Sequence, residues 1–333
     1  MESKASERIV WIDWAKSVGM FLVILGHCHI RENEQFVTQF IYSFHMPFFF
    51  FLSGLLCKRE LSIQSIKKDI IFLIIPYITY GIIHLLCIFR FDIDYIVGYI
   101  ISLFVGMDIS IGPIWFLPAL FICKQLYLLV RKTKVLKKWI YYSFLILSFF
   151  PSYFISYHRL NIPFFADSAL CGMPFFIIGH ESYLFIEKIR CMEWVKKFLL
   201  SIVLGCISLL LCKYNGYSNI AMCVVGRSIF VYYLVAFSAI LSLSIICMMM
   251  NGFMQSYITV TSYGTIVTLG LHGIPLTLLN YYIPTIFGYE LSVYSLYIAL
   301  VYSIITYCVC YVMILFVARK CPLAFGIRPI SFQ

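Results

Sequence analysis

The chain has 333 residues, of which 62% are hydrophobic and only 12% are charged, and its mean hydropathy is +0.93. About a quarter of the residues in an ordinary soluble domain are charged, so this composition excludes a soluble globular protein and indicates an integral membrane protein. The formal net charge of +10 is spread over short basic clusters between apolar segments. Because such clusters are typical of membrane orientation, we expect the lipid bilayer as a partner and no nucleic acid.

Apolar runs long enough to cross the roughly 30 Å of membrane hydrocarbon recur along the chain. No linker rich in Ser, Gly or Pro separates them, so residues 1–333 are expected to form one integral membrane domain. The first run lacks a small-residue cleavage site and is expected to remain as a helix. We therefore predict an all-α, polytopic transmembrane bundle of about ten helices, near residues 9–30, 36–57, 70–89, 113–130, 139–156, 167–187, 197–212, 226–249, 257–280 and 293–317.

The segment 93–107 is also apolar, but it is short and is bracketed by Asp92, Asp94 and Asp108. If it crossed the membrane, the basic cluster "RKTKVLKK" at 131–138 would lie outside the cell. If it does not cross, 18 of the 25 Lys and Arg residues lie on one side. The positive-inside rule favours the second arrangement, with both termini cytoplasmic and 93–107 as a re-entrant or interfacial segment.

Motifs of metal sites and of soluble enzymes are missing from the sequence. The thirteen cysteines lie almost entirely in apolar runs, without CxxC pairs or zinc spacing, and are expected to pack as small hydrophobic residues. His27 and His29 would point about 200° apart on a helix, which argues against a metal site shared with His45. No GxSxG, Walker A or GxGxxG motif is present, so we expect neither a metal ion nor a soluble-type nucleophile.

The first predicted helix carries ionisable side chains at both ends. Asp13 and Lys16 lie one turn apart near one end, and His27 lies near the other. The eleven steps from Lys16 to His27 return to within about 20° of the same face, with a rise of roughly 16 Å. This stripe suits a relay through the membrane. The alternative is that Asp13 and Lys16 only neutralise each other at the interface and that His27 is a helix end reaching toward water.

Further polar side chains are predicted on the same outer side as His27. They are His45 in "SFHMPFFFFLSG", Asp167 in "IPFFADSAL" and His272 in "GTIVTLGLHGIPL". A short loop joins the first two helices, so His27 and His45 can share one cavity, although His45 alone would also be explained as a hydrogen-bonded core residue. Trp115 in "GPIWFLPALF" is placed at the outer mouth of the fourth helix, where composition alone suggests an interfacial tryptophan.

Five motifs occur in order along nearly the whole chain: "RIVWIDWAKSVGMFLVILGH", "SFHMPFFFFLSG", "IWFLPALF", "IPFFADSAL" and the "LH" of the ninth predicted helix. Together they resemble the acyltransferase-3 family and, within it, the fucose-4-O-acetylase-like membrane proteins. The resemblance implies an integral membrane O-acyltransferase of the bacterial cytoplasmic membrane. It also implies that an acyl group passes from cytoplasmic acyl-CoA to a sugar of a glycan or of a lipid-linked glycan.

Several residues match functional positions of that family. The signature at the start of the first helix falls on Arg8, Asp13 and Lys16, and the essential histidine falls on His27. The serine-glycine step falls on Ser53 and Gly54, and the WF motif falls on Trp115.

One stretch departs from the family pattern. Many members carry arginines just before the proline that opens the third helix, whereas this chain has Lys67 and Lys68, followed by Asp69. Lysine binds phosphate as a point charge, without the bidentate geometry of arginine. The resemblance therefore supports the fold more firmly than the donor site.

Acyl transfer to a hydroxyl requires a base for the proton and hydrogen-bond donors for the oxyanion. We expect His27 to be the base, with Asp13, Lys16 and His45 as further catalytic residues. The expected substrate-binding residues are Arg8, Lys67, Lys68, Ser53, Trp115, Asp167 and His272. No permanently bound cofactor is expected, and acetyl-CoA or another acyl-CoA is the donor substrate. The alternative function is export of polysaccharide or acyl groups, since polar groups inside a helical bundle are also typical of transporters.

Overall fold

The computed structural model describes residues 9–28, 30–58, 60–87, 92–106, 109–158, 160–250, 252, 254–282, 285–286 and 295–329. These residues form helices joined by short connections and contain no strand. The α-helices are α1 (Val10–Gly26), α2 (Gln35–Leu55), α3 (Ile63–Asp69), α4 (Ile75–Cys87), α5 (Ile93–Val105), α6 (Phe116–Leu136), α7 (Lys138–Leu147), α8 (Pro151–His158), α9 (Ala166–Glu181), α10 (Tyr183–Arg190), α11 (Trp194–Asn215), α12 (Ile229–Met249), α13 (Gln255–Tyr263), α14 (Thr265–Leu271), α15 (Gly273–Thr277) and α17 (Leu296–Lys320).

The helices have the lengths and composition of membrane spans, which confirms the predicted all-α membrane class. Within the described residues, seven helices are long and apolar enough to cross a membrane when α3 with α4, and α7 with α8, are each counted as one helix, and up to nine are if each of two bent pairs is also one span. With 17 residues, α1 is shorter than these and is not among them. The expectation of about ten crossings, which includes α1, stays a prediction.

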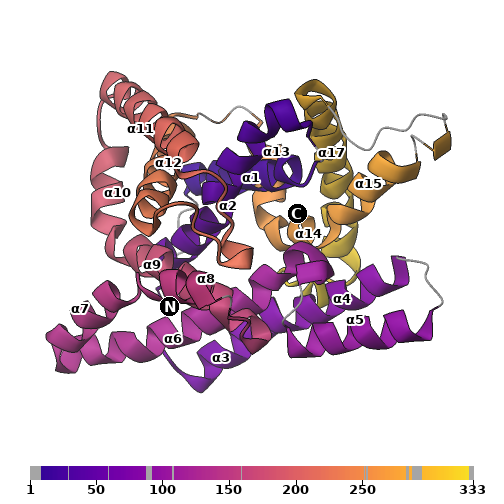
Figure 1. Cartoon of the computed structure of the whole chain (residues 1–333), viewed down its shortest axis with the longest axis horizontal. Helices are drawn as coiled ribbons and strands as arrows, with labels where there is room; N and C mark the ends of the chain where they lie inside the picture. Colours follow the sequence, from indigo (N-terminus) through magenta and orange to yellow (C-terminus); the bar gives the residue numbers. More distant parts are fainter. Residues whose placement is uncertain are drawn as a thin grey trace, which may run out of the picture.

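The first two long helices occupy the middle of the molecule (Figure 1). Helix α1 contacts α2, α12, α13, α14 and α17, and α2 contacts α9 and α12 as well. Helices α9 to α12 lie on one side of this pair, and α13, α14 and α17 lie on the other, while α4, α5 and α6 run along one edge. The polar residues of α1 therefore lie inside the bundle.

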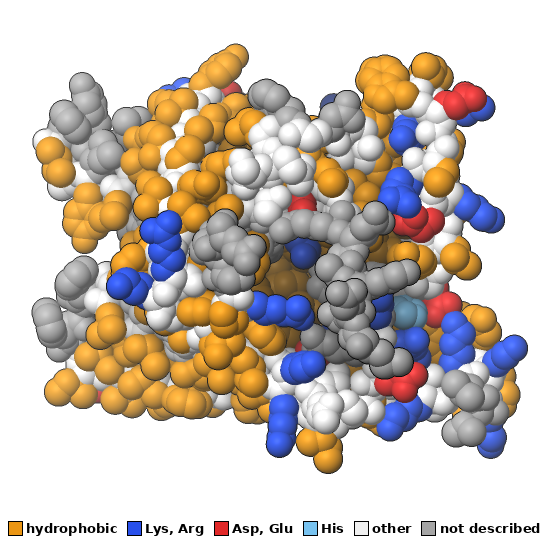
Figure 2. Space-filling view, turned by 180° about the vertical axis from the view of Figure 1, so that it is seen from behind, with side chains coloured by type: hydrophobic (Ala, Val, Ile, Leu, Met, Phe, Trp, Pro, Cys, Tyr) orange, Lys and Arg blue, Asp and Glu red, His pale blue; other side chains and the backbone are white. Residues whose placement is uncertain are grey.

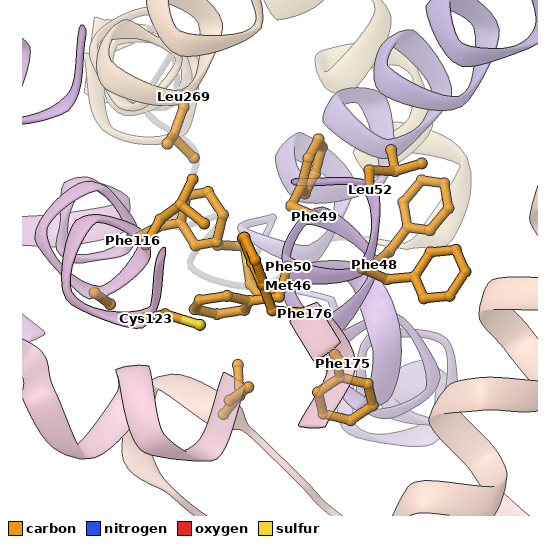
Figure 3. Close-up of a cluster of buried hydrophobic side chains, with 14 of the residues drawn as sticks. Met46, Phe48, Phe49, Phe50, Leu52, Phe116, Cys123, Phe175, Phe176 and Leu269 are labelled. Atoms are coloured by element: carbon orange, nitrogen blue, oxygen red, sulfur yellow. The ribbon is translucent and has the colours of Figure 1, made fainter. Parts of the chain in front are cut away.

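The core is an aromatic cluster between α2, α6 and α9 (Figure 3). Phe50 of α2 is fully buried, and its ring lies edge-to-face on Phe116 of α6 with 5.0 Å between the centroids. Phe176 of α9 packs on Tyr127 of α6 at 5.1 Å. Such offset and edge-to-face pairs add about 0.5–1.5 kcal/mol each beyond burial.

Two glycines bring the backbones of α2 and α9 into direct contact. A β-carbon at Gly54 would overlap the carbonyl oxygen of Phe176, and one at Gly179 would overlap that of Phe51. Small residues permit this approach between membrane helices. The serine-glycine step of the sequence motif therefore has a packing role at Gly54.

Three of the predicted spans are interrupted in the structure. The fifth, 139–156, is divided into α7 and α8 just before Pro151, a residue that disfavours helix in the position before it. The sixth bends by 59° between α9 and α10, and the ninth bends by 65° between α13 and α14. The ninth bends at Gly264, where a β-carbon would overlap the side chain of Ile314.

The segment predicted not to cross the membrane contains one short helix. α5 spans 13 residues, fewer than a crossing requires. It packs along α4, where the Tyr77 hydroxyl donates to the Leu103 carbonyl at 2.6 Å and a β-carbon at Gly81 would overlap the Leu103 side chain. This length agrees with an interfacial or re-entrant segment, whereas its side of the membrane stays a prediction.

A buried ion pair joins the start of the third span to α6. The Asp69 carboxylate is 3% exposed and accepts from Lys124 Nζ at 2.6 Å and from Gln125 Nε2 at 2.9 Å. Asp69 directly precedes a π-helical stretch, Ile70–Ile74. The pair fixes where this span meets α6.

We expect Lys124→Met to lower the free energy of unfolding by about 3–5 kcal/mol, because the substitution removes the ammonium group that pairs with the buried Asp69 carboxylate. The midpoint of thermal unfolding in detergent micelles measures the effect. Lys196→Met is the matched control, because Lys196 pairs with Glu193 on the surface, where both side chains are more than 60% exposed, and its effect should stay within about 1 kcal/mol. Equal effects of the two substitutions would contradict a structural role for the buried pair.

Candidate functional site

Helix α1 ends at the histidine that the sequence predicts as the base. The backbone N–H of His27 donates to the carbonyls of Val23 and Ile24, at 3.2 and 3.1 Å, at the C-terminal end of the helix. The imidazole is half-buried. Its ring centroid lies 5.3 Å from that of His272 and 6.1 Å from that of Tyr42. The end of α1 thus places His27 against two other elements.

His45 and His272 are buried and are held in one orientation. They are 3% and 1% exposed. Nδ1 of His45 lies 2.7 Å from the Ile41 carbonyl oxygen, and Nδ1 of His272 lies 2.9 Å from that of Thr268. A carbonyl only accepts, so Nδ1 carries the hydrogen in both neutral rings and Nε2 is left without one. Each side chain therefore has one nitrogen that can accept a proton.

These histidines come from three separate parts of the chain. His27 ends α1, His45 lies in the middle of α2, and His272 lies between α14 and α15. His272 interacts electrostatically with His45, His27 and His84. The Nε2 of His84, in α4, is 2.6 Å from the Gly270 carbonyl oxygen. Four of the seven histidines therefore gather at one place in the bundle.

A pocket of about 540 Å³ opens at His27. The end of α1 with the segment after it, the first two turns of α2, and one residue of the loop after α11 form its walls. The lining residues are Gly26, His27, Cys28, Ile30, Gln35, Thr38, Gln39, Tyr42 and Tyr217. This volume is in the range of about 300–1,000 Å³ typical of small-molecule sites.

Tyr217 reaches the pocket from a loop held by asparagine side chains. Asn215 Nδ2 donates to the Val225 carbonyl at 2.8 Å, and Asn219 Nδ2 donates to the Tyr217 hydroxyl at 2.9 Å. The Tyr217 ring lies 6.2 Å from that of Tyr42, which in turn lies 5.1 Å from the ring of His45. An aromatic pair thus borders the histidines on the pocket side.

The other end of α1 holds Asp13 and Lys16. Asp13 is 6% exposed, and its carboxylate accepts from the Ser262 hydroxyl of α13 at 2.6 Å. One turn further along α1, the buried Ser17 side chain hydrogen-bonds with Thr261 of α13. Lys16 is half-buried. Since the rise from Lys16 to His27 is roughly 16 Å, the charged pair and the histidines belong to opposite ends of α1.

Lys67 and Lys68 lie exposed in the last turn of α3. The neighbouring Asp69 is bound to Lys124 and Gln125, so its carboxylate is compensated by α6.

On one face of the molecule, Lys and Arg side chains gather around a hollow at the centre (Figure 2). Such a concentration of positive charge attracts anionic ligands.

The remaining predicted site residues have other surroundings. Trp115 is 4% exposed and packs edge-to-face on Phe116, so it belongs to the core rather than to the membrane interface. The Asp167 carboxylate accepts from the backbone N–H groups of Ser168 and Ile162, at 2.7 and 3.4 Å, at the start of α9. Ser53 is half-buried beside Gly54. Arg8 and His29 lie outside the described residues.

Sequence reasoning missed several polar residues around the histidines. Gln35, Thr38, Gln39 and Tyr42 are spaced i, i+3, i+4 and i+7, which is one face of a helix, and this spacing was available in the sequence. Tyr217 carried no such signal. Among the described residues, no three His, Cys, Asp or Glu side chains are placed to hold a metal ion.

An all-helical membrane protein with proton-accepting imidazoles at a polar pocket has groups suited to acyl transfer onto a hydroxyl. The family model of the acyltransferase-3 domain matches residues 9–315, so the chain belongs to the acyltransferase-3 family and is a membrane acyltransferase. This match confirms the resemblance at the level of the family. The comparison with curated proteins found no match, and neither did the comparison with solved structures.

Proposed function

We propose that the chain is an O-acetyltransferase that moves an acetyl group from acetyl-CoA to a hydroxyl of a cell-surface glycan or a lipid-linked sugar. The observation that carries this proposal is the meeting of His27, His45 and His272, from three separate elements, beside a polar pocket. The fucose-4-O-acetylase-like branch and the bacterial cytoplasmic membrane belong to the same proposal.

The proposed reaction needs one base at the acceptor. An imidazole nitrogen of His27 takes the hydroxyl proton while the oxygen attacks the thioester carbonyl carbon. The tetrahedral intermediate then expels CoA as the carbon–sulfur bond breaks, and the thiolate takes up a proton. General-base catalysis of this kind contributes about 10²–10⁴-fold to the rate. Tyr42 and the buried His272 lie against the His27 ring, and the buried His45 lies against Tyr42.

The donor is proposed to enter at the Asp13 end of α1. We place this end, both termini and the cluster 131–138 in the cytoplasm, on the basis of the Lys and Arg count. The basic face in Figure 2 supports an anionic donor, because CoA carries phosphates. The thioester end of the donor then has to extend along α1 to His27, at the outer side, so that the acceptor hydroxyl can attack its carbonyl carbon.

Replacing Lys67 and Lys68 together by Ala should raise the KM for acetyl-CoA on the order of tenfold with little change in kcat, because exposed lysines contribute to binding and not to the chemical step. Steady-state kinetics at low and high salt measure the effect, which salt should reduce. Replacing Lys196 and Lys197 by Ala is the control, since these are also adjacent helical lysines. An unchanged KM would place the donor elsewhere, with 131–138 as the next candidate.

Mass spectrometry of surface glycans from a deletion strain tests the proposed function. O-acetyl groups on one glycan should disappear on deletion and return with the wild-type gene. Loss of the whole glycan from the surface, rather than of its acetyl groups, would favour the alternative function of an exporter.

A further inference from the structure

The pocket at His27 has a polar lining without strong charge. Among its described lining residues there is no Asp, Glu, Lys or Arg. The charged residues that precede α2 lie outside the lining: Arg31 and Glu32 are exposed. The carboxylate of Glu34 instead accepts from the backbone N–H of Leu296 at 2.7 Å, at the start of α17. Among these described lining residues, His27 is therefore the one side chain whose protonated form could pair with an anionic ligand.

The polar groups of the pocket can both donate and accept hydrogen bonds. Gln35, Thr38, Gln39 and Tyr42 form a stripe on one face of α2. Amides and hydroxyls each donate and accept, which is also the property of a sugar hydroxyl. The Thr38 hydroxyl is buried and has no hydrogen-bond partner within the described part of the chain. The stripe is thus a set of neutral hydrogen-bonding groups, of which the Thr38 hydroxyl is unsatisfied.

Aromatic rings provide the second kind of contact. Tyr42 and Tyr217 lie 6.2 Å apart at an angle of 46°, so their faces are inclined to each other. Aromatic faces pack well on the apolar C–H face of a pyranose ring, whose hydroxyls point sideways. The hydrogen bond from Asn219 fixes the position of the Tyr217 hydroxyl, so this wall is already formed.

We propose that this pocket binds an uncharged sugar, held by Gln35, Gln39 and the Tyr42–Tyr217 pair with one hydroxyl toward His27, and that it excludes uronic acids. This inference rests on the proposed function, since it names the class of acceptor for the same site. It explains why the described lining of this pocket holds amides and tyrosines and neither lysine nor arginine.

Binding of sugars to the purified protein in lipid nanodiscs tests the inference without requiring transferase activity. Saturation-transfer difference NMR would compare the methyl glycosides of glucose, galactose, mannose and fucose with those of glucuronic and galacturonic acid. We expect at least one neutral glycoside to bind at least tenfold more tightly than either uronate. Equal or tighter binding of a uronate would overturn the inference, and so would the absence of binding by every neutral glycoside.

Variants then locate the bound sugar. Gln39→Leu and Tyr217→Leu are each expected to weaken binding of the neutral glycoside about tenfold, whereas Tyr217→Phe, which keeps the aromatic face, should stay within about threefold. Gln64→Leu, at an exposed position of α3, is the control and should bind normally. Unchanged binding by both leucine variants at the pocket would place the sugar elsewhere. Acetyl transfer by a protein that prefers uronates would leave the proposed function standing and would reject this inference alone.

Discussion

His27→Gln is expected to lower kcat for acetyl transfer by about 10²–10⁴-fold, with a much smaller change in the KM for acetyl-CoA. Glutamine is similar in size and polarity but cannot act as a base near neutral pH. His27 is half-buried at the end of α1, so glutamine can occupy its place without burying a new charge. Single-turnover transfer by purified protein measures the chemical step directly.

The control for this substitution is His158→Gln, at an exposed position at the end of α8. It should transfer acetyl groups at the wild-type rate. Near-normal turnover by His27→Gln in folded protein would instead make His27 a packing residue, and the role of base would move to His45 or His272.

Gly54→Ala is expected to destabilise the protein by about 3 kcal/mol or more, because a β-carbon there would overlap the carbonyl oxygen of Phe176. The obstacle is backbone, which cannot turn aside as a flexible side chain would, so α2 and α9 would have to separate. Both helices carry part of the aromatic core (Figure 3). The yield of monodisperse protein and the midpoint of its thermal unfolding in detergent measure the effect.

Gly98→Ala is the matched control, because Gly98 lies inside α5 and a β-carbon there would contact nothing within 4 Å. This substitution should be neutral or should stabilise α5 by up to about 1 kcal/mol, the difference in helix propensity. Similar losses of stability from both substitutions would show that the close contact of α2 and α9 is not what Gly54 provides.

The helices of this protein were predictable because a membrane span leaves a long apolar run in the sequence. The segment 93–107 could be separated from the spans by its length and its aspartates. The bends were not predictable from apolar runs: the bend at Gly264 depends on contact with Ile314, about fifty residues further along the chain. Hydropathy is a local property, whereas such contacts depend on how distant helices pack.

The candidate site was predictable to different degrees. The predicted membrane topology placed His27, His45 and His272 toward the same side of the membrane, and the structure brings them together. The helical spacing of the stripe from Gln35 to Tyr42 was visible in the sequence. Its role as a pocket wall could not be predicted, because the sequence does not show which helix face lines the pocket. The position of Tyr217 could not be predicted from the sequence, because it depends on side-chain hydrogen bonds of Asn215 and Asn219 within an irregular loop.

The proposed function requires that this acyltransferase uses His27 to transfer an acetyl group from acetyl-CoA to a glycan hydroxyl. Its most direct test is acetyl-CoA turnover in proteoliposomes, with glycan isolated from the deletion strain as acceptor and with wild type and His27→Gln compared side by side. The wild type should release CoA and form alkali-labile acetyl esters on the glycan in equal amounts, and His27→Gln should form almost none. Movement of glycan across the membrane without CoA release, or equal ester formation by both proteins, would contradict the claim.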